Sequence, residues 1–157
     1  MQFRKIAIAA DHAGRELKLQ LKQFLADNHI PCRDFGVEDG ETESVDYPDY
    51  AAPLASAVSR GEVDAGIAIC GSGIGMAICA NKFPGVRAVS AWDNWSCSKG
   101  REHNDSNVLC LASRQLSISQ AMELVHLWLT TPYVGDRHEG RLQKLREIEQ
   151  ENFKSPH

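Results

Sequence analysis

Apolar and polar residues follow two patterns along this chain. Short, uninterrupted apolar runs have the length and composition of buried β-strands. The strands predicted in this way cover residues 5–10, 32–35, 65–70, 86–91 and 107–112. Between them, apolar residues recur three or four positions apart, as Leu17, Leu21 and Leu25 do, and this period predicts helices. The helices predicted in this way cover residues 17–28, 50–60, 76–82, 116–129 and 137–151, with a short one inside 92–102.

The order of these elements predicts the fold. Strands alternate with helices, which implies right-handed βαβ units and a parallel sheet covered on both faces. Residues 36–48 are polar and turn-rich, so we expect a surface loop there. No repeat or interdomain linker interrupts the pattern, and we expect one domain over residues 1–157. Ligands of such sheets bind beyond the carboxyl ends of the strands. The turns after the first, third and fifth strands are therefore the candidate site.

Composition narrows the class of protein. The 157 residues are 43% hydrophobic and 24% charged, with a formal net charge of −4. This balance argues against binding nucleic acid or a membrane surface. The apolar run at the N-terminus is too short for a secretory signal, so we expect a cytoplasmic protein. The five cysteines include no CxxC pair, which argues against a disulfide framework or a zinc site.

The turn after the third strand, residues 69–75 (ICGSGIG), carries the strongest chemical signal. Its glycines allow a tight turn whose N–H groups approach a ligand closely, and the helix that follows favours an anion. The spacing fits neither the GxGxxG fingerprint nor a nucleotide P-loop. Cys70 stands at the strand tip, where the start of a helix stabilises a thiolate suited to act as a base. The alternative is an inert cysteine buried at a strand end.

Two polar segments accompany this turn. Asp11 and His12 follow the first strand, where the carboxylate would bind sugar hydroxyls and the imidazole would donate to a phosphate. Asp11 is equally suited to cap the N–H groups of the residues that follow it. The second segment is residues 103–107 (HNDSN), just before the fifth strand. Its polar side chains exceed the needs of a simple turn, although a histidine in a loop is usually only solvated.

Arginines supply candidate phosphate ligands. Arg137 and Arg141 are four residues apart on the last predicted helix, so they share one face. Two guanidinium groups on one face bind a phosphate well, whereas ordinary surface charge is the alternative. Arg114, after the fifth strand, is a further candidate.

Taken in order, these motifs resemble the B-type ribose-5-phosphate isomerases and the galactose-6-phosphate isomerase subunits. The likeness spans nearly the whole chain. The motifs that carry it are Ala9–Gly14, Asp46–Tyr47–Pro48, Ile69–Gly75, Ala80–Asn81–Lys82, Arg87–Ala88, His103–Asn107 and Arg137–Arg141. The resemblance implies a three-layer, flavodoxin-like (Rossmann-type) sheet of five parallel strands flanked by helices, with a C-terminal helix. It also implies a homodimer, or a pair of dimers, with active sites shared between subunits and with neither metal nor organic cofactor.

The resemblance also assigns roles to residues. Cys70 would be the base, and His103 would open the furanose ring of the sugar. The amides of residues 71–75 would stabilise an enediolate, as preorganised donors do where negative charge develops on oxygen. The catalytic candidates are Cys70, His103, Ser72 and Asp11. The substrate-binding candidates are Asp11, His12, Gly71, Ser72, Gly73, Ile74, Gly75, Asn104, Arg114, Arg137 and Arg141, of which His12 and the three arginines would bind the phosphate.

The predicted function is the interconversion of ribose 5-phosphate and ribulose 5-phosphate through an enediolate. The same reaction on erythrose or erythrulose 4-phosphate, or on allose or galactose 6-phosphate, is the alternative. The stretch 92–97, which follows the fourth strand and would border the sugar, carries two tryptophans, Trp92 and Trp95, that do not match the common ribose pattern. A non-catalytic sugar-phosphate sensor or flavodoxin-like binding module is a different class of protein. The presence of Cys70, His103 and both C-terminal arginines argues against it.

Overall fold

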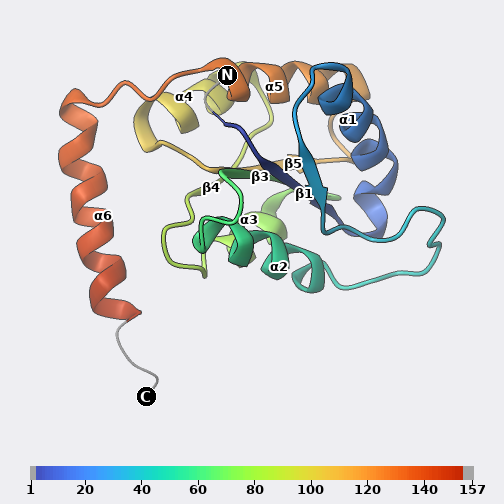
Figure 1. Ribbon diagram of the computed structural model, residues 1–157, viewed down its shortest axis with the longest axis horizontal. Coiled ribbons are helices and arrows are strands. Elements are labelled where there is room, and N and C mark those ends of the chain that lie inside the picture. The colour runs from blue at the N-terminus through green and yellow to red at the C-terminus, as the bar shows by residue number, and fades with distance from the viewer. Residues whose placement is uncertain (1–2, 154–157) are drawn as a thin grey trace.

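Five parallel strands form one sheet between two layers of helices (Figure 1). The computed structural model describes residues 3–153. The strands are β1 (Ile6–Ala10), β2 (Cys32–Asp34), β3 (Ala65–Cys70), β4 (Ala88–Ser90) and β5 (Val108–Ala112). All five predicted strands are present, which confirms the three-layer α/β fold with a parallel sheet. The fourth is shorter than the predicted run over 86–91.

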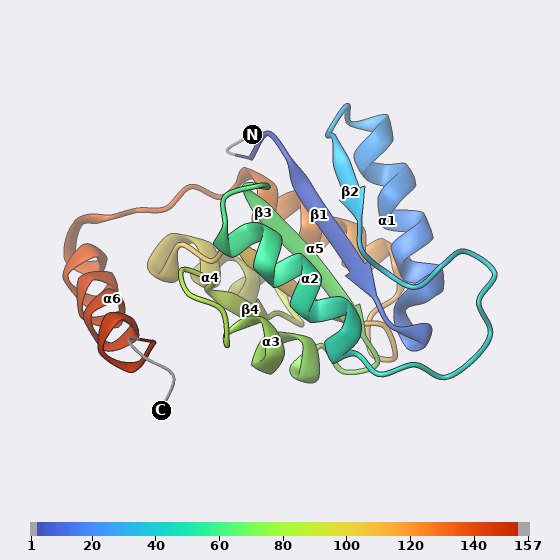
Figure 2. The ribbon, with the colours of Figure 1, turned by 60° about the horizontal axis from the view of Figure 1, so that its bottom comes forward.

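The helices divide between the two faces of the sheet (Figure 2). They are α1 (Arg15–Asp27), α2 (Pro48–Ser59), α3 (Ile74–Ala80), α4 (Asn94–Asn104), α5 (Ile118–Thr130) and α6 (Glu139–Asn152), with 3₁₀ turns η1 (His12–Gly14) and η2 (Asp136–His138). Helices α1, α4 and α5 contribute to the core on one face, and α2 and α3 to the core on the other. Alternate residues of β1 point to opposite faces, so Ile8 packs under α1 and α5 and Ala9 under α2.

Helix α4 differs from the short helix predicted inside 92–102. Asp93 begins it with a capping box: its carboxylate accepts a hydrogen bond from the backbone N–H of Ser96 at 2.7 Å, and the Ser96 hydroxyl accepts from the Asp93 N–H. Asp105 ends it in a left-handed conformation with φ of 46°. His103 and Asn104 therefore lie on the last turn of a helix and not in a loop before β5.

The strand order is β2-β1-β3-β5-β4. Relative to the flavodoxin order 2-1-3-4-5, the last two strands are exchanged, so β5 lies beside β3 and β4 lies at the edge. The carboxyl end of β3 is therefore flanked by those of β1 and β5. Gly14 lets the chain after β1 turn closely over β3, because a Cβ there would lie 2.6 Å from Cγ2 of Ile69.

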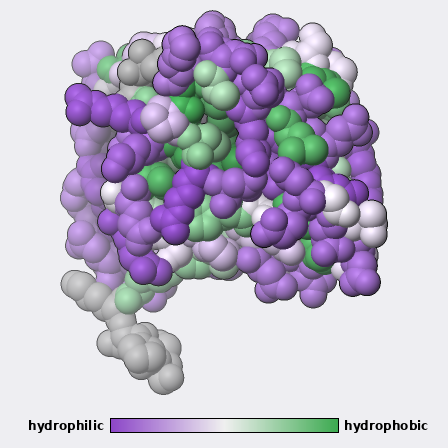
Figure 3. All heavy atoms as spheres, turned by 45° about the vertical axis from the view of Figure 1, so that its right-hand side comes forward, coloured by the Kyte–Doolittle hydropathy of each residue, from purple (hydrophilic) through white to green (hydrophobic). Residues whose placement is uncertain are grey.

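Helix α6 stands beside the sheet and not on it (Figure 1). Leu142 is its one buried residue, whereas Leu145 and Ile148 are 49% and 55% exposed. The side of the molecule formed by α1 and the 36–47 loop is, by contrast, mostly hydrophilic (Figure 3). No helix within residues 3–153 is long and apolar enough to cross a membrane.

Candidate active site

A pocket of about 640 Å³ opens at the carboxyl ends of the strands. It lies where the parallel topology predicts a ligand site. Of the residues proposed from sequence, it brings together Asp11, Cys70, Gly71, Ser72, Ile74, Gly75 and Arg114. Of the stretch 92–97, which we expected to border the sugar, Trp92 lines the pocket. The wall is completed by five residues that the sequence did not predict for the site: Tyr47, Ser90, Ala91, Ala112 and Gln115.

Cys70 is the last residue of β3 and is 5% exposed. Its Sγ accepts a hydrogen bond from the backbone N–H of Gly73 at 3.1 Å. That bond requires the chain to fold back at Gly73, whose φ of 73° favours glycine. The sulfur is thus held at the pocket by a backbone amide of the turn that follows it. A cysteine accepts a proton in its thiolate form.

Two glycines of the same turn make room for neighbouring side chains. A Cβ on Gly71 would lie 3.1 Å from Nη1 of Arg114, and a Cβ on Gly75 would lie 2.8 Å from Cζ of Tyr47. The guanidinium and the phenol ring therefore pack directly against the turn that follows Cys70. An arginine in this position brings a positive charge to the pocket, as an anionic ligand requires.

Asp11 both caps a turn and lines the pocket. Its Oδ1 accepts hydrogen bonds from the backbone N–H groups of Ala13 at 2.9 Å and Gly14 at 3.2 Å. The Ser113 hydroxyl contacts the carbonyls of Ala13 at 2.8 Å and Cys70 at 3.1 Å and ties this turn to the tip of β3. The carboxylate is thus held at the pocket by the backbone around it.

His12 is half-buried next to the pocket but does not line it. Its Nδ1 accepts a hydrogen bond from the backbone N–H of Val45 at 3.1 Å, which attaches the histidine to the 36–47 loop. A ring nitrogen that accepts a hydrogen bond carries no proton, so the neutral ring holds its proton on Nε2. His12 would therefore bind a phosphate as an Nε2–H donor.

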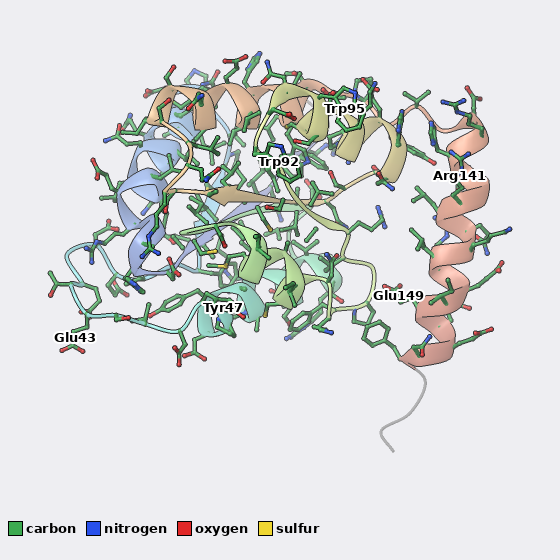
Figure 4. All side chains as sticks on the ribbon, turned by 180° about the vertical axis from the view of Figure 1, so that it is seen from behind. Glu43, Tyr47, Trp92, Trp95, Arg141 and Glu149 are labelled. Atoms are coloured by element: carbon green, nitrogen blue, oxygen red, sulfur yellow. The ribbon has the colours of Figure 1, made fainter. Side chains whose placement is uncertain are left out.

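His103, Asn104, Arg137 and Arg141 do not line this pocket. They belong to a second group at the junction of α4, η2 and α6. The ring of His103 stacks on the ring of His138, with centroids 4.1 Å apart and planes 15° apart. Figure 4 shows Arg141 on α6, well separated from Tyr47 and Trp92 at the pocket. One chain therefore divides the predicted site residues into two groups.

The second group is rich in positive charge. Arg137 and Arg141 both contact the His138 ring, at 3.5 Å and 3.3 Å, so the two guanidinium groups lie together as their spacing predicts. Partial desolvation, and then the charges of His103 and the two arginines, lower the pKa of His138. His138 belongs to one of the sequence motifs, but its position there predicts no role for it.

A parallel sheet that brings a thiol, a carboxylate, a guanidinium and a turn of backbone amides to one pocket defines an enzyme of acid–base chemistry on a small anionic substrate. Comparison with known proteins identifies the family of this enzyme. The family model described as Ribose/Galactose Isomerase matches residues 6–145. The chain belongs to this family, and it is a sugar-phosphate isomerase that interconverts aldoses and ketoses.

Individual relatives are similar to this chain along almost their whole length. A putative sugar phosphate isomerase of Bacillus subtilis is 45% identical over 95% of this chain and 99% of its own. Ribose-5-phosphate isomerase B of Escherichia coli is 42% identical over 94% of this chain and 98% of its own. The structure of ribose-5-phosphate isomerase B from Clostridium thermocellum superposes with a TM-score of 0.90 at 41% identity, covering 94% of this chain and 99% of that one.

The family is not uniform in substrate. A relative from Pectobacterium atrosepticum, 34% identical over 89% of this chain and 91% of its own, is named D-erythrulose-4-phosphate isomerase. Membership therefore establishes the reaction class but not the sugar.

Proposed function

We propose that this enzyme interconverts ribose 5-phosphate and ribulose 5-phosphate, with Cys70 as the base. The observation that carries the proposal is the position of the Cys70 sulfur, which lies in the pocket and accepts a hydrogen bond from the turn that follows it. Three relatives named for ribose 5-phosphate are 36–42% identical, whereas a relative named for a four-carbon sugar is 34% identical. This difference favours the pentose.

The pocket supports each step of an enediolate mechanism. The Cys70 thiolate removes the proton from C2 of the open aldose and returns it to C1, which gives the ketose. Negative charge builds on the carbonyl oxygen in between, and backbone amides of residues 71–75 stabilise it, typically by a few kcal/mol per donor. Ser72 lines the same pocket, where its hydroxyl is suited to carry a proton between the two substrate oxygens. Asp11 binds the sugar hydroxyls.

We further propose that the active site is shared in a homodimer. The pocket contains the base and Arg114, but the groups for ring opening and for most of the phosphate binding lie elsewhere on the chain. A second copy that places its own second group over the pocket would complete the site. Exposed apolar residues support such an interface: Ile74 and Ile78 on α3, and Leu145 and Ile148 on α6. A further pairing into tetramers stays a prediction.

A turnover panel tests the substrate. We expect ribose 5-phosphate to give a kcat/KM at least about tenfold above that of erythrulose 4-phosphate, allose 6-phosphate or galactose 6-phosphate, because one carbon more or less in a fitted pocket changes kcat/KM by roughly 10–200-fold. A higher value for another sugar would transfer the function to that substrate. Binding of sugar phosphates without any turnover would instead indicate a sensor.

His103→Ala tests the ring-opening step. We expect this variant to convert ribose 5-phosphate roughly 10²-fold more slowly, because a positioned acid–base group contributes about 10²–10⁴-fold. Ribulose 5-phosphate has no furanose form, so exchange of its C1 proton with D₂O, followed by NMR, should continue. Erythrulose 4-phosphate, which cannot cyclise either, is a second control substrate. If exchange and net conversion fell by the same factor, His103 would act in the proton transfer itself.

A further inference from the structure

We propose that His138 is a positioning residue that holds His103 and Arg141 as one unit. The inference rests on the proposed function, in which His103 opens the sugar ring and Arg141 binds the phosphate. His138 ends η2, directly before α6, and is 5% exposed. It is thus nearly buried beside His103, Arg137 and Arg141.

The first contact of His138 is its stack on His103. The ring centroids are 4.1 Å apart and the planes are nearly parallel, at 15°. His103 is at the end of α4, and its side chain is 36% exposed. The nearest carboxylate, Glu102, is 4.0 Å from Nε2 of His103 and is already paired with Lys99 at 2.5 Å. The ring of His138 therefore supports a whole face of the His103 ring and fixes its orientation.

The second contact of His138 is with the arginines. Guanidinium groups only donate hydrogen bonds, so a ring nitrogen facing one must be an unprotonated acceptor. Two guanidinium donors face the ring: Nε of Arg137 at 3.5 Å from Nε2, and Nη1 of Arg141 at 3.3 Å from Nδ1. A neutral imidazole has a single acceptor, and we assign it to Nδ1 because that contact is the shorter. The lowered pKa of His138 agrees with a neutral ring near pH 7.

The two contacts use different parts of one side chain. The flat face of the ring supports His103, and Nδ1 holds Arg141. A phenyl ring would keep the face and lose the acceptor, whereas an asparagine amide would keep an acceptor near Nδ1 and lose the face. His138→Phe and His138→Asn therefore separate the two effects. A general loss of packing would instead affect both variants in the same way.

We expect one variant to change KM and the other to change kcat. His138→Phe should raise KM for ribose 5-phosphate and the Kd of inorganic phosphate about five- to tenfold, with kcat within about twofold of wild type, because only the hydrogen bond to a charged group is lost. His138→Asn should keep both KM and Kd and lower kcat about tenfold. It should leave C1 exchange of ribulose 5-phosphate in D₂O unchanged. His126→Asn, on the exposed side of α5, is the matched control and should change nothing.

A double variant shows whether His138 acts through His103. In the His103→Ala background, His138→Asn should lower kcat no further. The proposal is overturned if the two losses multiply, or if His138→Phe and His138→Asn change kcat and KM alike, with melting temperatures measured for both. A wild-type enzyme inactive on the whole panel would overturn the proposed function instead, and the Kd of inorganic phosphate would still report on the contact between Nδ1 and Arg141.

Discussion

Cys70→Ala should lose at least about 10²-fold in turnover while keeping its fold and its affinity for phosphate. The loss follows from removing a positioned base, which contributes roughly 10²–10⁴-fold. The fold should persist because the side chain becomes smaller at a pocket wall, where no sealed cavity is left behind. Turnover is measured on ribose 5-phosphate, the fold by circular dichroism and melting temperature, and the affinity by titration with inorganic phosphate.

Cys79→Ala is the matched control for this variant. Cys79 lies on α3, on the same turn-and-helix segment, but does not line the pocket. We expect it to keep wild-type turnover within about twofold. More than about a tenth of wild-type activity in Cys70→Ala would place the base on another residue.

Alkylation provides an independent test of the same thiol. Burial raises the pKa of the Cys97 thiol to about 12 and raises those of Cys79 and Cys110. These three groups are therefore protonated near pH 8 and react slowly. Cys32 is exposed, so the experiment is done in a Cys32→Ser background. Iodoacetamide should then modify Cys70 first, and bound sugar phosphate should protect it. Faster labelling of Cys97 or Cys110 would contradict a reactive Cys70.

The fold was largely predictable because its signals are local. Apolar runs such as Ala65–Cys70 are buried along their whole length in the structure, as a central parallel strand requires. The strand order was not predictable from these runs, since nothing local distinguishes β4 from β5 as the edge strand. The length of α4 was missed although its signal was present, because Asp93 and Ser96 form a capping box.

The site was predictable where one short segment carries it. The glycines around Cys70 belong to a single turn, so their spacing alone indicates an amide-lined pocket. Tyr47 and His138 were missed as site residues for the opposite reason. Tyr47 reaches the pocket only because Gly75 has no side chain, and His138 gains its place from packing against His103. Such contacts depend on tertiary structure, which residue spacing does not encode.

The division of the site into two groups leads to a test by subunit mixing. Neither Cys70→Ala nor the double variant Arg137→Ala/Arg141→Ala should be active alone, because the first lacks the base and the second lacks two phosphate ligands. In a shared site, each pocket takes its arginines from the other chain. Mixing Cys70→Ala with Arg114→Ala is the control, because both residues line the same pocket and no intact site can form.

A mixed dimer of Cys70→Ala with the arginine double variant contains two unlike sites. One combines the damaged pocket with the damaged arginines, whereas the other combines an intact Cys70 with intact Arg137 and Arg141. Each mixed dimer should therefore recover about half of wild-type activity by site counting, measured after exchange of subunits verified by native mass spectrometry. Exchange without recovery would show that base and arginines act within one chain. A monomer by light scattering at micromolar concentration would rule out the shared site directly.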